Sequence, residues 1–334
     1  MKKNYEESKV VSVFFAADDG YLPYLEVSLA SLSEHASPEY VYDVHILSSG
    51  FSKASLDCLK SMVKENVKVT ADDVTSLIAP IKEALALRLR DYYSETIYYR
   101  LFIPSMFKNL KRAVYLDSDV VLLEDVAKLF FTPLYGKILG AVTDESVISV
   151  PIFSSYVKGY VGTRTANHYF NSGVLLMDLD GFRRNCIEER FRELLLTRNF
   201  KTVAPDQDYL NFLCRGKVRY LPSGWNKHAI AGRDIPEEDL YLIHFNMFNK
   251  PWRYDGVPYE AHFWRYADMT PSKELLRREK ASYTDEMKAQ DYEAAGRLLN
   301  SAADILENEA PIFEAAQSHS FLSTLGGALA SAVN

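Results

Sequence analysis

Two aspartates separated by one serine, Asp117-Ser118-Asp119, are the residues of this sequence that point most directly to chemistry. They follow the apolar run of residues 113–116, which predicts that a strand delivers both carboxylates to one loop. Carboxylates spaced in this way can turn toward a single hard divalent cation. Most triplets of this type are solvated turns, so it is the preceding strand that favours a metal site.

A histidine at the end of another apolar run supplies a third candidate ligand. His244 follows residues 240–243, again where a predicted strand ends. An imidazole combined with two carboxylates makes a mixed nitrogen and oxygen set, which suits Mn²⁺ better than Mg²⁺, although Mg²⁺ stays an alternative. The structural alternative is a histidine at the edge of the core that bonds to backbone.

Lys250 follows six residues later in a Lys-Pro-Trp turn, where it is placed to meet a phosphate, although exposed lysines are common on any surface. The sequence has no GxGxxG and no GxxxxGK(S/T) loop to hold phosphates through backbone amides. If the chain binds a nucleotide, the metal and the lysine must therefore neutralise its diphosphate. The motifs GxSxG and HExxH are also absent, which excludes hydrolases of those types.

The elements that must position these residues alternate between strand and helix. Apolar or β-branched runs predict strands at residues 10–17, 42–47, 67–70 and 113–116. Helical patterns at 25–32 and 54–65 separate the first of them. This alternation is typical of an α/β domain with a mostly parallel sheet.

Three of the predicted strands end next to an aspartate: Asp117, then Asp144 after residues 138–142, and Asp178 after residues 173–177. In an open α/β sheet, ligands bind in the crevice beyond the carboxyl ends of the strands. We therefore predict that these carboxylates gather at one site. The alternative is that each is an ordinary turn or helix-capping residue.

The composition changes near Pro271. We predict one α/β domain over residues 1–270 and a helical C-terminal extension over residues 271–334, which is rich in Ala and Glu. Residues 318–334 carry no Asp, Glu, Lys or Arg. This favours a frayed or disordered end, with contact to a membrane or a partner as the alternative.

The net charge, the cysteines and the N-terminal segment limit the classes of function and the cellular location that we expect. A net charge of −7 leaves no excess of Lys and Arg to displace the counterions of a nucleic acid, so nucleic-acid binding is not expected. Cys58, Cys186 and Cys214 form no CxxC pair, which predicts buried free thiols in a reducing compartment. The N-terminal segment turns acidic too early for a signal peptide, and the run at 10–17 is too short to span a bilayer. These features predict a cytoplasmic protein.

Several short stretches, taken together and in order, resemble the enzymes of glycosyltransferase family 8, which include bacterial lipooligosaccharide galactosyltransferases and glycogenin. The stretches lie at residues 14–21, 100–104, 114–119, 169–174, 205–208 and 244–252. Most of them are weak individually, whereas their combination in this order is highly specific.

The resemblance implies a domain of the GT-A fold that binds a nucleotide-sugar. It also implies a retaining, metal-dependent transfer of a hexose from UDP-glucose or UDP-galactose to a saccharide acceptor on a glycan, a lipooligosaccharide or a glycoprotein. Peripheral association with the inner face of a membrane, through the acceptor or the C-terminal end, is an open alternative. Residues 273–334 are net acidic, unlike the basic tails of some bacterial relatives, and this weakens attraction to anionic lipids.

The resemblance also assigns roles residue by residue. The metal ligands would be Asp117, Asp119 and His244, and the lysine facing the diphosphate would be Lys250. The nucleotide would also contact Ala16, Asp18, Tyr21 and Ser118. The donor sugar would be surrounded by Arg100, Asp144, Asn171, Asp206 and Gln207, the last of which faces the anomeric carbon.

The residue types fit the chemistry of such a transfer. Cleavage of the sugar–UDP bond places negative charge on the diphosphate, which the metal and Lys250 would stabilise. Retention can arise by double displacement through an enzyme nucleophile, or by front-face attack in which the departing phosphate takes the acceptor proton. An amide oxygen is a poor nucleophile, so Gln207 favours front-face attack, with Gln207 and Asp206 orienting the sugar. The sequence leaves both mechanisms open.

Two other classes of function stay open: a hydrolase of the same UDP-sugar, and a non-catalytic module that binds nucleotide-sugars. A closed acceptor cleft would favour the hydrolase. Loss of a metal ligand or of Lys250 would favour the binding module, and none of these residues is missing. One departure from the family is Met247, where many members have Gly. Glycine would let the backbone approach the phosphate closely. Because this chain has Met instead, the resemblance does not imply a contact between this backbone and the phosphate.

A predicted helix over residues 92–107 carries Arg100 and four tyrosines, Tyr92, Tyr93, Tyr98 and Tyr99. Tyrosines at helical spacing usually cover the edge of a core, and stacking on an acceptor sugar is the functional alternative.

Overall fold

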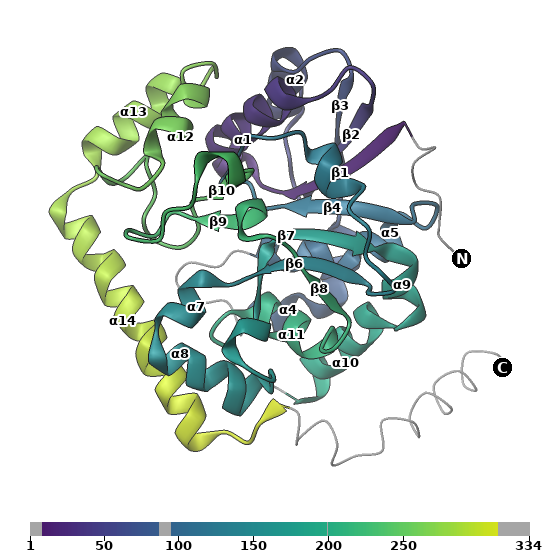
Figure 1. Cartoon of the computed structure of the whole chain (residues 1–334), viewed down its shortest axis with the longest axis vertical. Coiled ribbons are helices and arrows are strands. Elements are labelled where there is room, and N and C mark those ends of the chain that lie inside the picture. The colour runs from purple at the N-terminus through teal and green to yellow at the C-terminus, as the bar shows by residue number, and fades with distance from the viewer. Residues whose placement is uncertain (1–8, 87–94, 199, 313–334) are drawn as a thin grey trace.

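The computed structural model describes residues 9–86, 95–198 and 200–312. Two sheets organise these residues: a large sheet with helices packed on both faces and a small sheet beside it (Figure 1). The strands are β1 (Val10–Ala16), β2 (Val41–Ser48), β3 (Val67–Asp73), β4 (Arg112–Leu116), β5 (Val120–Leu122), β6 (Leu139–Thr143), β7 (Phe170–Asp178), β8 (Val218–Tyr220), β9 (Lys227–His228) and β10 (Leu242–His244).

The large sheet has the strand order β3-β2-β1-β4-β7-β6-β8, and within it β7 alone is antiparallel to its neighbours. The predicted α/β fold with a mostly parallel sheet is therefore confirmed. Side chains of β1 alternate between two hydrophobic cores, with Phe14 and Ala16 in one and Val13 and Phe15 in the other. Because both faces of the sheet are buried, its strands read as continuous apolar runs.

The direction of β7 changes which residues reach the carboxyl edge of the sheet. Arg112, the first residue of β4, lies opposite Asp178, the last residue of β7. Asp178 is therefore at the far edge, where its carboxylate accepts from the Gly181 amide at 3.0 Å and caps a helix. The prediction that Asp178 joins Asp117 and Asp144 is wrong, and the N-terminal end of β7 reaches the crevice instead.

Helices cover the sheets and continue beyond them. The α-helices are α1 (Leu22–His35), α2 (Lys53–Met62), α3 (Thr75–Ile78), α4 (Lys82–Ala86), α5 (Ile103–Met106), α6 (Val126–Phe130), α7 (Glu145–Ser149), α8 (Pro151–Tyr156), α9 (Leu179–Arg184), α10 (Ile187–Arg198), α11 (Pro205–Leu213), α12 (Glu260–Ala267), α13 (Lys273–Ser282) and α14 (Asp285–Asn308). Two further helices matter below: the 3₁₀ helix η3 (Glu95–Phe102) and the π-helical turn η4 (Val157–Val161).

The segment predicted as one helix over residues 92–107 is η3 followed by α5, from residue 95 onward. Tyr98 and Tyr99 are fully buried, which confirms the core interpretation for these two. Tyr92 and Tyr93 lie outside the described residues. The packing of Tyr98 and Tyr99 fixes η3, which carries Arg100.

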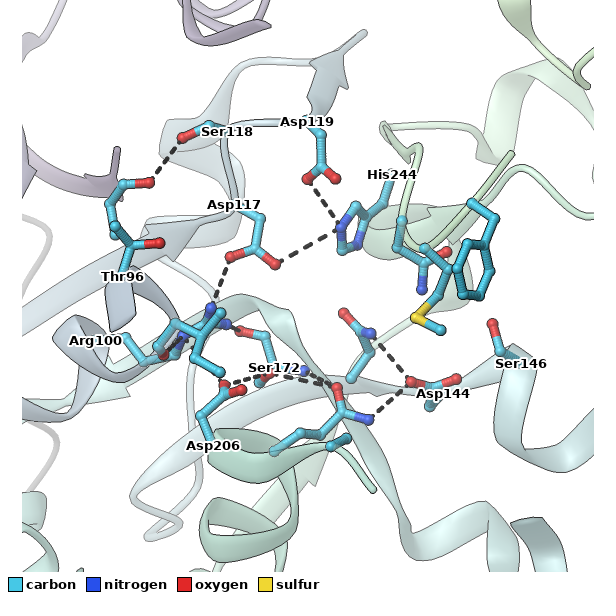
Figure 2. Close-up of a pocket in the computed structure, with 18 of the residues that line it drawn as sticks. Thr96, Arg100, Asp117, Ser118, Asp119, Asp144, Ser146, Ser172, Asp206 and His244 are labelled. Atoms are coloured by element: carbon cyan, nitrogen blue, oxygen red, sulfur yellow. Dashed lines mark hydrogen bonds and ion pairs between the residues drawn. The ribbon is translucent and has the colours of Figure 1, made fainter. Parts of the chain in front are cut away.

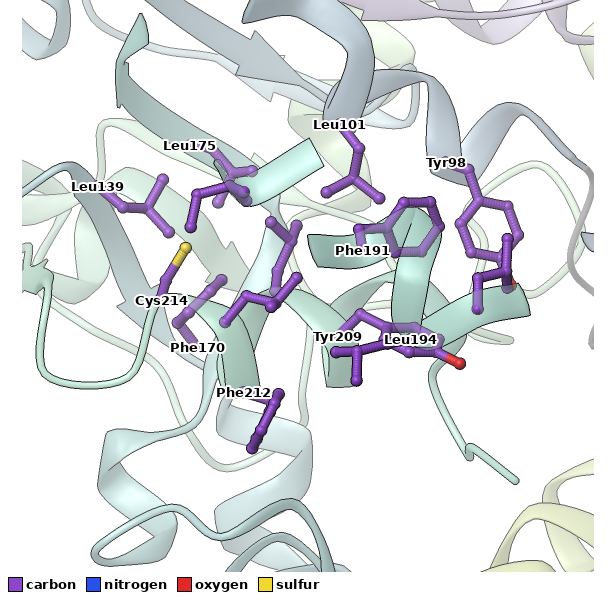
Figure 3. Close-up of a cluster of buried hydrophobic side chains, with 14 of the residues drawn as sticks. Tyr98, Leu101, Leu139, Phe170, Leu175, Phe191, Leu194, Tyr209, Phe212 and Cys214 are labelled. Atoms are coloured by element: carbon purple, nitrogen blue, oxygen red, sulfur yellow. The ribbon is translucent and has the colours of Figure 1, made fainter. Parts of the chain in front are cut away.

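The core beneath η3 is a cluster of aromatic and aliphatic side chains (Figure 3). Tyr98 lies beside Phe191 of α10, whose ring packs edge-on against Tyr209 of α11 with 5.2 Å between centroids. The free thiol of Cys214 is buried in the same cluster. Cys186 is also free but exposed, so the prediction of buried thiols is wrong for that residue.

The C-terminal extension is helical over α13 and α14, as predicted. Helix α14 runs alongside α8 and η4 and buries Leu298, Ala302 and Ile305 in the core (Figure 1). Residues 318–334, predicted to be frayed, lie outside the described part of the chain. Among the described residues, no helix combines the length and the apolar character needed to cross a membrane.

A largely buried histidine links the first three strands of the large sheet. His45 of β2 places Nδ1 2.9 Å from Asp72 Oδ2 on β3, and Nε2 3.2 Å from Asp43 Oδ2. Its ring stacks on Phe14 of β1 with 4.7 Å between centroids. Burial acts to lower the pKa of His45, but the two carboxylates outweigh this effect and raise the pKa to about 9.

The ion pairs of His45 should make stability depend on pH. Because the pKa is raised from 6.5 in the unfolded chain to about 9, the stabilisation is complete below pH 6.5 and is lost as the pH rises through 9. We expect His45→Gln to lower the free energy of unfolding by about 2 kcal/mol more at pH 6 than at pH 10. Urea unfolding of both proteins at the two pH values measures the difference, and an equal loss at both would contradict the ion-pair explanation.

Candidate functional site

The Asp117-Ser118-Asp119 turn is fixed by backbone and side-chain hydrogen bonds to neighbouring strands. Ser118 Oγ donates to the carbonyl of Ala16 at the end of β1 at 3.0 Å. The Asp117 amide donates to the carbonyl of Gly173 on β7 at 2.7 Å. With the turn held in this way, the carboxylates of Asp117 and Asp119 both point toward His244 (Figure 2).

The small sheet brings His244 to the two aspartates. β5 begins directly after the triplet, and β10 pairs with it in antiparallel fashion, so that His244 lies opposite Val120. His244 Nε2 is 3.2 Å from Asp119 Oδ1 and 3.7 Å from Asp117 Oδ2. One ligand atom from each of the three residues lies within 4.8 Å of the other two, which is compatible with one cation bound by all three.

Gly173 on β7 leaves the space beside these ligands. A Cβ atom at this position would stand 2.3 Å from His244 Cε1 and 2.6 Å from Asp117 Oδ2. Such distances are far below van der Waals contact, so either side chain would have to move. The two carboxylates, the imidazole and the free space beside Gly173 therefore fit a divalent cation.

Two cations balance the partly buried acidic pair. Arg100 donates from a terminal guanidinium nitrogen to Asp117 Oδ1 at 2.9 Å, and Lys250 Nζ pairs with Asp119 Oδ2 and donates to a backbone carbonyl. Burial tends to raise the pKa of Asp119, but Lys250 and His244 outweigh it and hold that pKa well below its usual range. Asp119 is therefore a carboxylate at neutral pH.

Arg100 also reaches the residues predicted to surround the donor sugar. Its Nε lies 3.4 Å from Asp206 Oδ2, and that oxygen accepts from Ser172 Oγ at 2.8 Å. Burial raises the pKa of Asp206, although Arg100 acts in the opposite direction. One guanidinium thus connects the candidate metal ligands to the start of α11.

Gln207, Asn171 and Asp144 continue this network across the site. Gln207 Oε1 accepts from the Ser172 amide at 2.9 Å, and its Nε2 donates to Asp144 Oδ2 at 2.9 Å. Asn171 Nδ2 donates to the same carboxylate oxygen at 3.1 Å. We call the set Arg100, Asp144, Asn171, Ser172, Asp206 and Gln207 the sugar-side network.

Sequence reasoning missed Asn226, which joins the two halves of the site. Its Oδ1 accepts from His244 Nδ1 at 2.9 Å, and its Nδ2 donates to Asn171 Oδ1 at 2.9 Å. Because an amide oxygen can only accept, His244 donates its Nδ1 proton to Asn226, which leaves Nε2 facing the aspartates as the nitrogen that could bind a metal. Asn226 ends a short 3₁₀ turn over residues 223–226. A lone Asn there has no spacing pattern, so the sequence held no signal for this role.

His228 is a second residue that the sequence did not indicate. Its ring lies edge-on to His244 with 5.6 Å between centroids, and its Nδ1 is 3.2 Å from Ser146 Oγ. It is fully buried, and burial lowers its pKa to about 4. His228 is therefore neutral at physiological pH and packs behind the candidate ligand.

The candidate metal ligands and the sugar-side network line one cavity of about 570 Å³, a size typical of small-ligand sites. Asp18, which lines this cavity, caps a short 3₁₀ turn by accepting from the Tyr21 amide at 3.1 Å. The lining includes every site residue predicted from the sequence: Ala16, Asp18, Tyr21, Arg100, Asp117, Ser118, Asp119, Asp144, Asn171, Asp206, Gln207, His244 and Lys250. The structure thus brings the whole predicted set together, while the role of each member stays a prediction.

A profile match over most of the chain shows which protein family it belongs to. Residues 12–256 match the profile of glycosyl transferase family 8. The chain belongs to glycosyltransferase family 8. It is therefore an enzyme that transfers a sugar, and nucleotide-sugar and saccharide are the general classes of its donor and acceptor.

Relatives of family 8 occur in bacteria and plants. The lipopolysaccharide 1,2-glucosyltransferase of Escherichia coli K12 is 24% identical over 276 residues, which are 77% of this chain and 78% of that protein. A protein of Arabidopsis thaliana named "Probable galacturonosyltransferase-like 9" is 28% identical over 272 residues, 74% of this chain and 68% of its own.

Solved structures show the same GT-A-like fold. The galactosyltransferase LgtC, in complex with donor and acceptor sugar analogs, superimposes with a TM-score of 0.65 at 24% identity, over 80% of this chain and all of that chain. The WbbM bifunctional glycosyltransferase gives a TM-score of 0.69 at 22% identity, over 84% of this chain and 53% of that one. This chain thus spans about half the length of the bifunctional protein.

Met247 is the departure from the family pattern noted in the sequence. Its φ of 60° lies in the left-handed region, which glycine adopts freely and other residues adopt at an expense of roughly 1–2 kcal/mol. The backbone therefore follows the path that glycine would favour. The Met side chain is exposed and adds to the lining of the cavity.

Gly173→Ala should disable the candidate metal site while leaving the fold intact. The added methyl group would displace His244 or Asp117, so we expect Mn²⁺ affinity to fall by about 10- to 100-fold. Isothermal titration with Mn²⁺ measures this. Gly50→Ala is the matched control, since a Cβ there would contact nothing within 4 Å, and equal Mn²⁺ affinity in both variants would contradict the assignment.

Asn226→Ala should weaken metal binding in a different way. It removes the acceptor of His244 Nδ1–H and leaves the imidazole free to rotate or to change tautomer. We expect Mn²⁺ affinity to fall by about tenfold, at the low end of outer-shell substitutions. The same titration tests this, and an NMR spectrum of the His244 ring that keeps the proton on Nδ1 in the variant would contradict the explanation.

Proposed function

We propose that this glycosyltransferase moves glucose or galactose from the corresponding UDP-sugar to a saccharide acceptor, with a divalent cation, Mn²⁺ before Mg²⁺, and with retention at the anomeric carbon. The observation that carries the proposal is that Asp117, Asp119, His244 and Lys250 share one cavity with the sugar-side network. A glucosyltransferase among the relatives supports a hexose. A relative named for galacturonosyl transfer makes a uronic acid donor the alternative.

The groups at the nucleotide side suit a diphosphate leaving group. A bound cation would supply Lewis-acid stabilisation of the charge that develops there. Lys250 lines the cavity while its ammonium group is buried beside Asp119, so it offers a positive charge in a fixed place. Arg100 bonds both Asp117 and Asp206, and thereby sets the separation of the nucleotide side from the sugar side.

The contacts of Gln207 support front-face attack over double displacement. Its Oε1 already accepts from Ser172 and its Nε2 donates to Asp144, so it is held as an orienting group. In front-face attack the bond between the anomeric carbon and the UDP oxygen breaks, and its electron pair leaves with UDP. The acceptor oxygen bonds to the same face of that carbon, and its proton passes to the departing phosphate.

The shape of the cavity favours transfer over hydrolysis. The lining continues past the sugar-side network to side chains of α8 and α14, which leaves room for an acceptor larger than water. No observation favours the non-catalytic module, since the candidate ligands and Lys250 are all present. A cytoplasmic location, with or without contact to the inner face of a membrane, stays a prediction from the sequence.

A donor screen with NMR detection tests the proposal. Protein with Mn²⁺ is offered UDP-glucose, UDP-galactose, UDP-N-acetylglucosamine and UDP-galacturonate, with and without a mixture of saccharide acceptors. We expect UDP release from a hexose donor, acceleration by acceptor and an α-linked product. Asp119→Ala should reduce turnover by at least two orders of magnitude, because the group that stabilises the leaving charge loses a ligand (roughly 10²–10³ for such groups).

Asp57→Ala, which removes a largely exposed carboxylate on α2, is the matched control and should keep full turnover. A β-linked product would contradict retention, and turnover that survives chelation would contradict the metal. Release of UDP that no acceptor accelerates would indicate the hydrolase, and tight UDP binding without turnover on any donor would indicate the binding module.

A further inference from the structure

The cavity has an apolar end to which the proposed reaction assigns no occupant. Side chains from separate parts of the chain line this end, and we call them the apolar wall. They are Val147 of α7, Phe153 of α8, Val157 of η4, Phe248 in the loop after β10, and Leu298 of α14. Val147, Phe153 and Phe248 are only half-buried, so part of their apolar surface faces the open cavity.

The apolar wall begins directly beside the sugar-side network. The Val147 amide donates to Asp144 Oδ1 at 3.0 Å, so the two residues share one helical turn. Phe248 lies in the loop between His244 and Lys250. An acceptor whose hydroxyl reached the donor sugar would therefore have its remaining part next to this wall.

The hydroxyl groups among the neighbouring lining residues already have partners. Tyr156 and Tyr169 donate to Asp208 at 2.7 and 2.6 Å, and Ser146 Oγ lies 3.2 Å from His228 Nδ1. A sugar ring pressed against the wall would lose water from its hydroxyls, and the protons of the two tyrosine hydroxyls are already donated to Asp208. An apolar group loses no hydrogen bond there and gains by leaving water.

Contacts at both ends of helix α14 hold Leu298 in place in the wall. Asp291 near its N-terminal end accepts from Tyr254 and Tyr283 at 2.8 and 2.6 Å. Beyond its C-terminal end, Glu309 pairs with Lys201 at 2.8 Å. The helix lies outside residues 12–256, so Leu298 comes from beyond the part of the chain that matches the family profile.

We infer that the apolar wall binds an apolar aglycone of the acceptor. The acceptor class is then a saccharide joined to an alkyl or aryl group rather than a free oligosaccharide. The inference rests on the proposed transferase function, because it places the acceptor from the expected position of the donor sugar. Contact of the aglycone with the wall does not require turnover, so it can be measured by binding alone.

The test compares glycosides that differ only in the aglycone. Methyl, octyl and phenyl β-D-galactosides and β-D-glucosides, kept below micellar concentrations, are titrated by calorimetry into the full chain saturated with UDP and Mn²⁺. We expect the octyl or phenyl glycoside to bind at least about tenfold more tightly than the methyl glycoside, a gain that burial of two methylene groups provides. Tighter binding of the octyl glycoside would indicate an alkyl aglycone, and tighter binding of the phenyl glycoside an aryl aglycone.

Variants locate this preference. Phe153→Asn and Leu298→Asn should reduce it to less than about threefold, with UDP binding unchanged. Leu299→Asn, the next residue on α14 and an exposed one, should keep the preference. Phe153 is half-buried, so its variant decides the matter if Leu298→Asn fails to fold.

Equal affinity for methyl and octyl or phenyl glycosides would overturn the inference, as would a preference that Phe153→Asn leaves intact. Absence of sugar transfer in the donor screen would remove the proposed function. The binding comparison would then still decide whether the wall holds an aglycone.

Discussion

The close approach of two partly buried carboxylates is the constraint on which this site depends. Asp117 and Asp119 repel each other, and an ion without a partner is unstable away from water. The chain offsets this with Arg100 from η3, His244 from β10 and Lys250 from the following loop. Since these residues are far apart in sequence, the acidic pair becomes stable only once both sheets have packed. A cation bound between the aspartates would relieve the same repulsion.

The antiparallel strand β7 decides what faces the acidic pair. Had β7 run parallel to β4, its C-terminal Asp178 would have added a further carboxylate to the crevice. Its reversal instead presents the backbone of Gly173 and the amide of Asn171. Space and neutral hydrogen-bonding groups thus replace further negative charge, which suits a site that receives a cation and an anionic nucleotide together.

The hydrogen-bond network has a consequence for how the two halves of the site cooperate. From His244 it passes through Asn226 and Asn171 to Asp144, and from there through Gln207 to the start of α11. The side-chain oxygens of Asn171, Asp144 and Gln207 each accept two hydrogen bonds. Such networks resist rearrangement because a broken bond leaves a buried polar group unpaired. The geometry of the candidate metal ligands and of the sugar-side network is therefore set jointly, before any ligand binds.

The sequence by itself determined the α/β class, the apolar strands and the candidate residues at their ends, because period, burial and residue type are local properties. It determined the family for the same reason, since six short stretches in order are readable without coordinates. Only the tertiary structure decided that Asp178 lies at the far edge, that Asn226 orients His244 and that Leu298 reaches the cavity. Those outcomes depend on strand direction and on contacts between segments far apart in the chain, and neither leaves a pattern in the residues nearby.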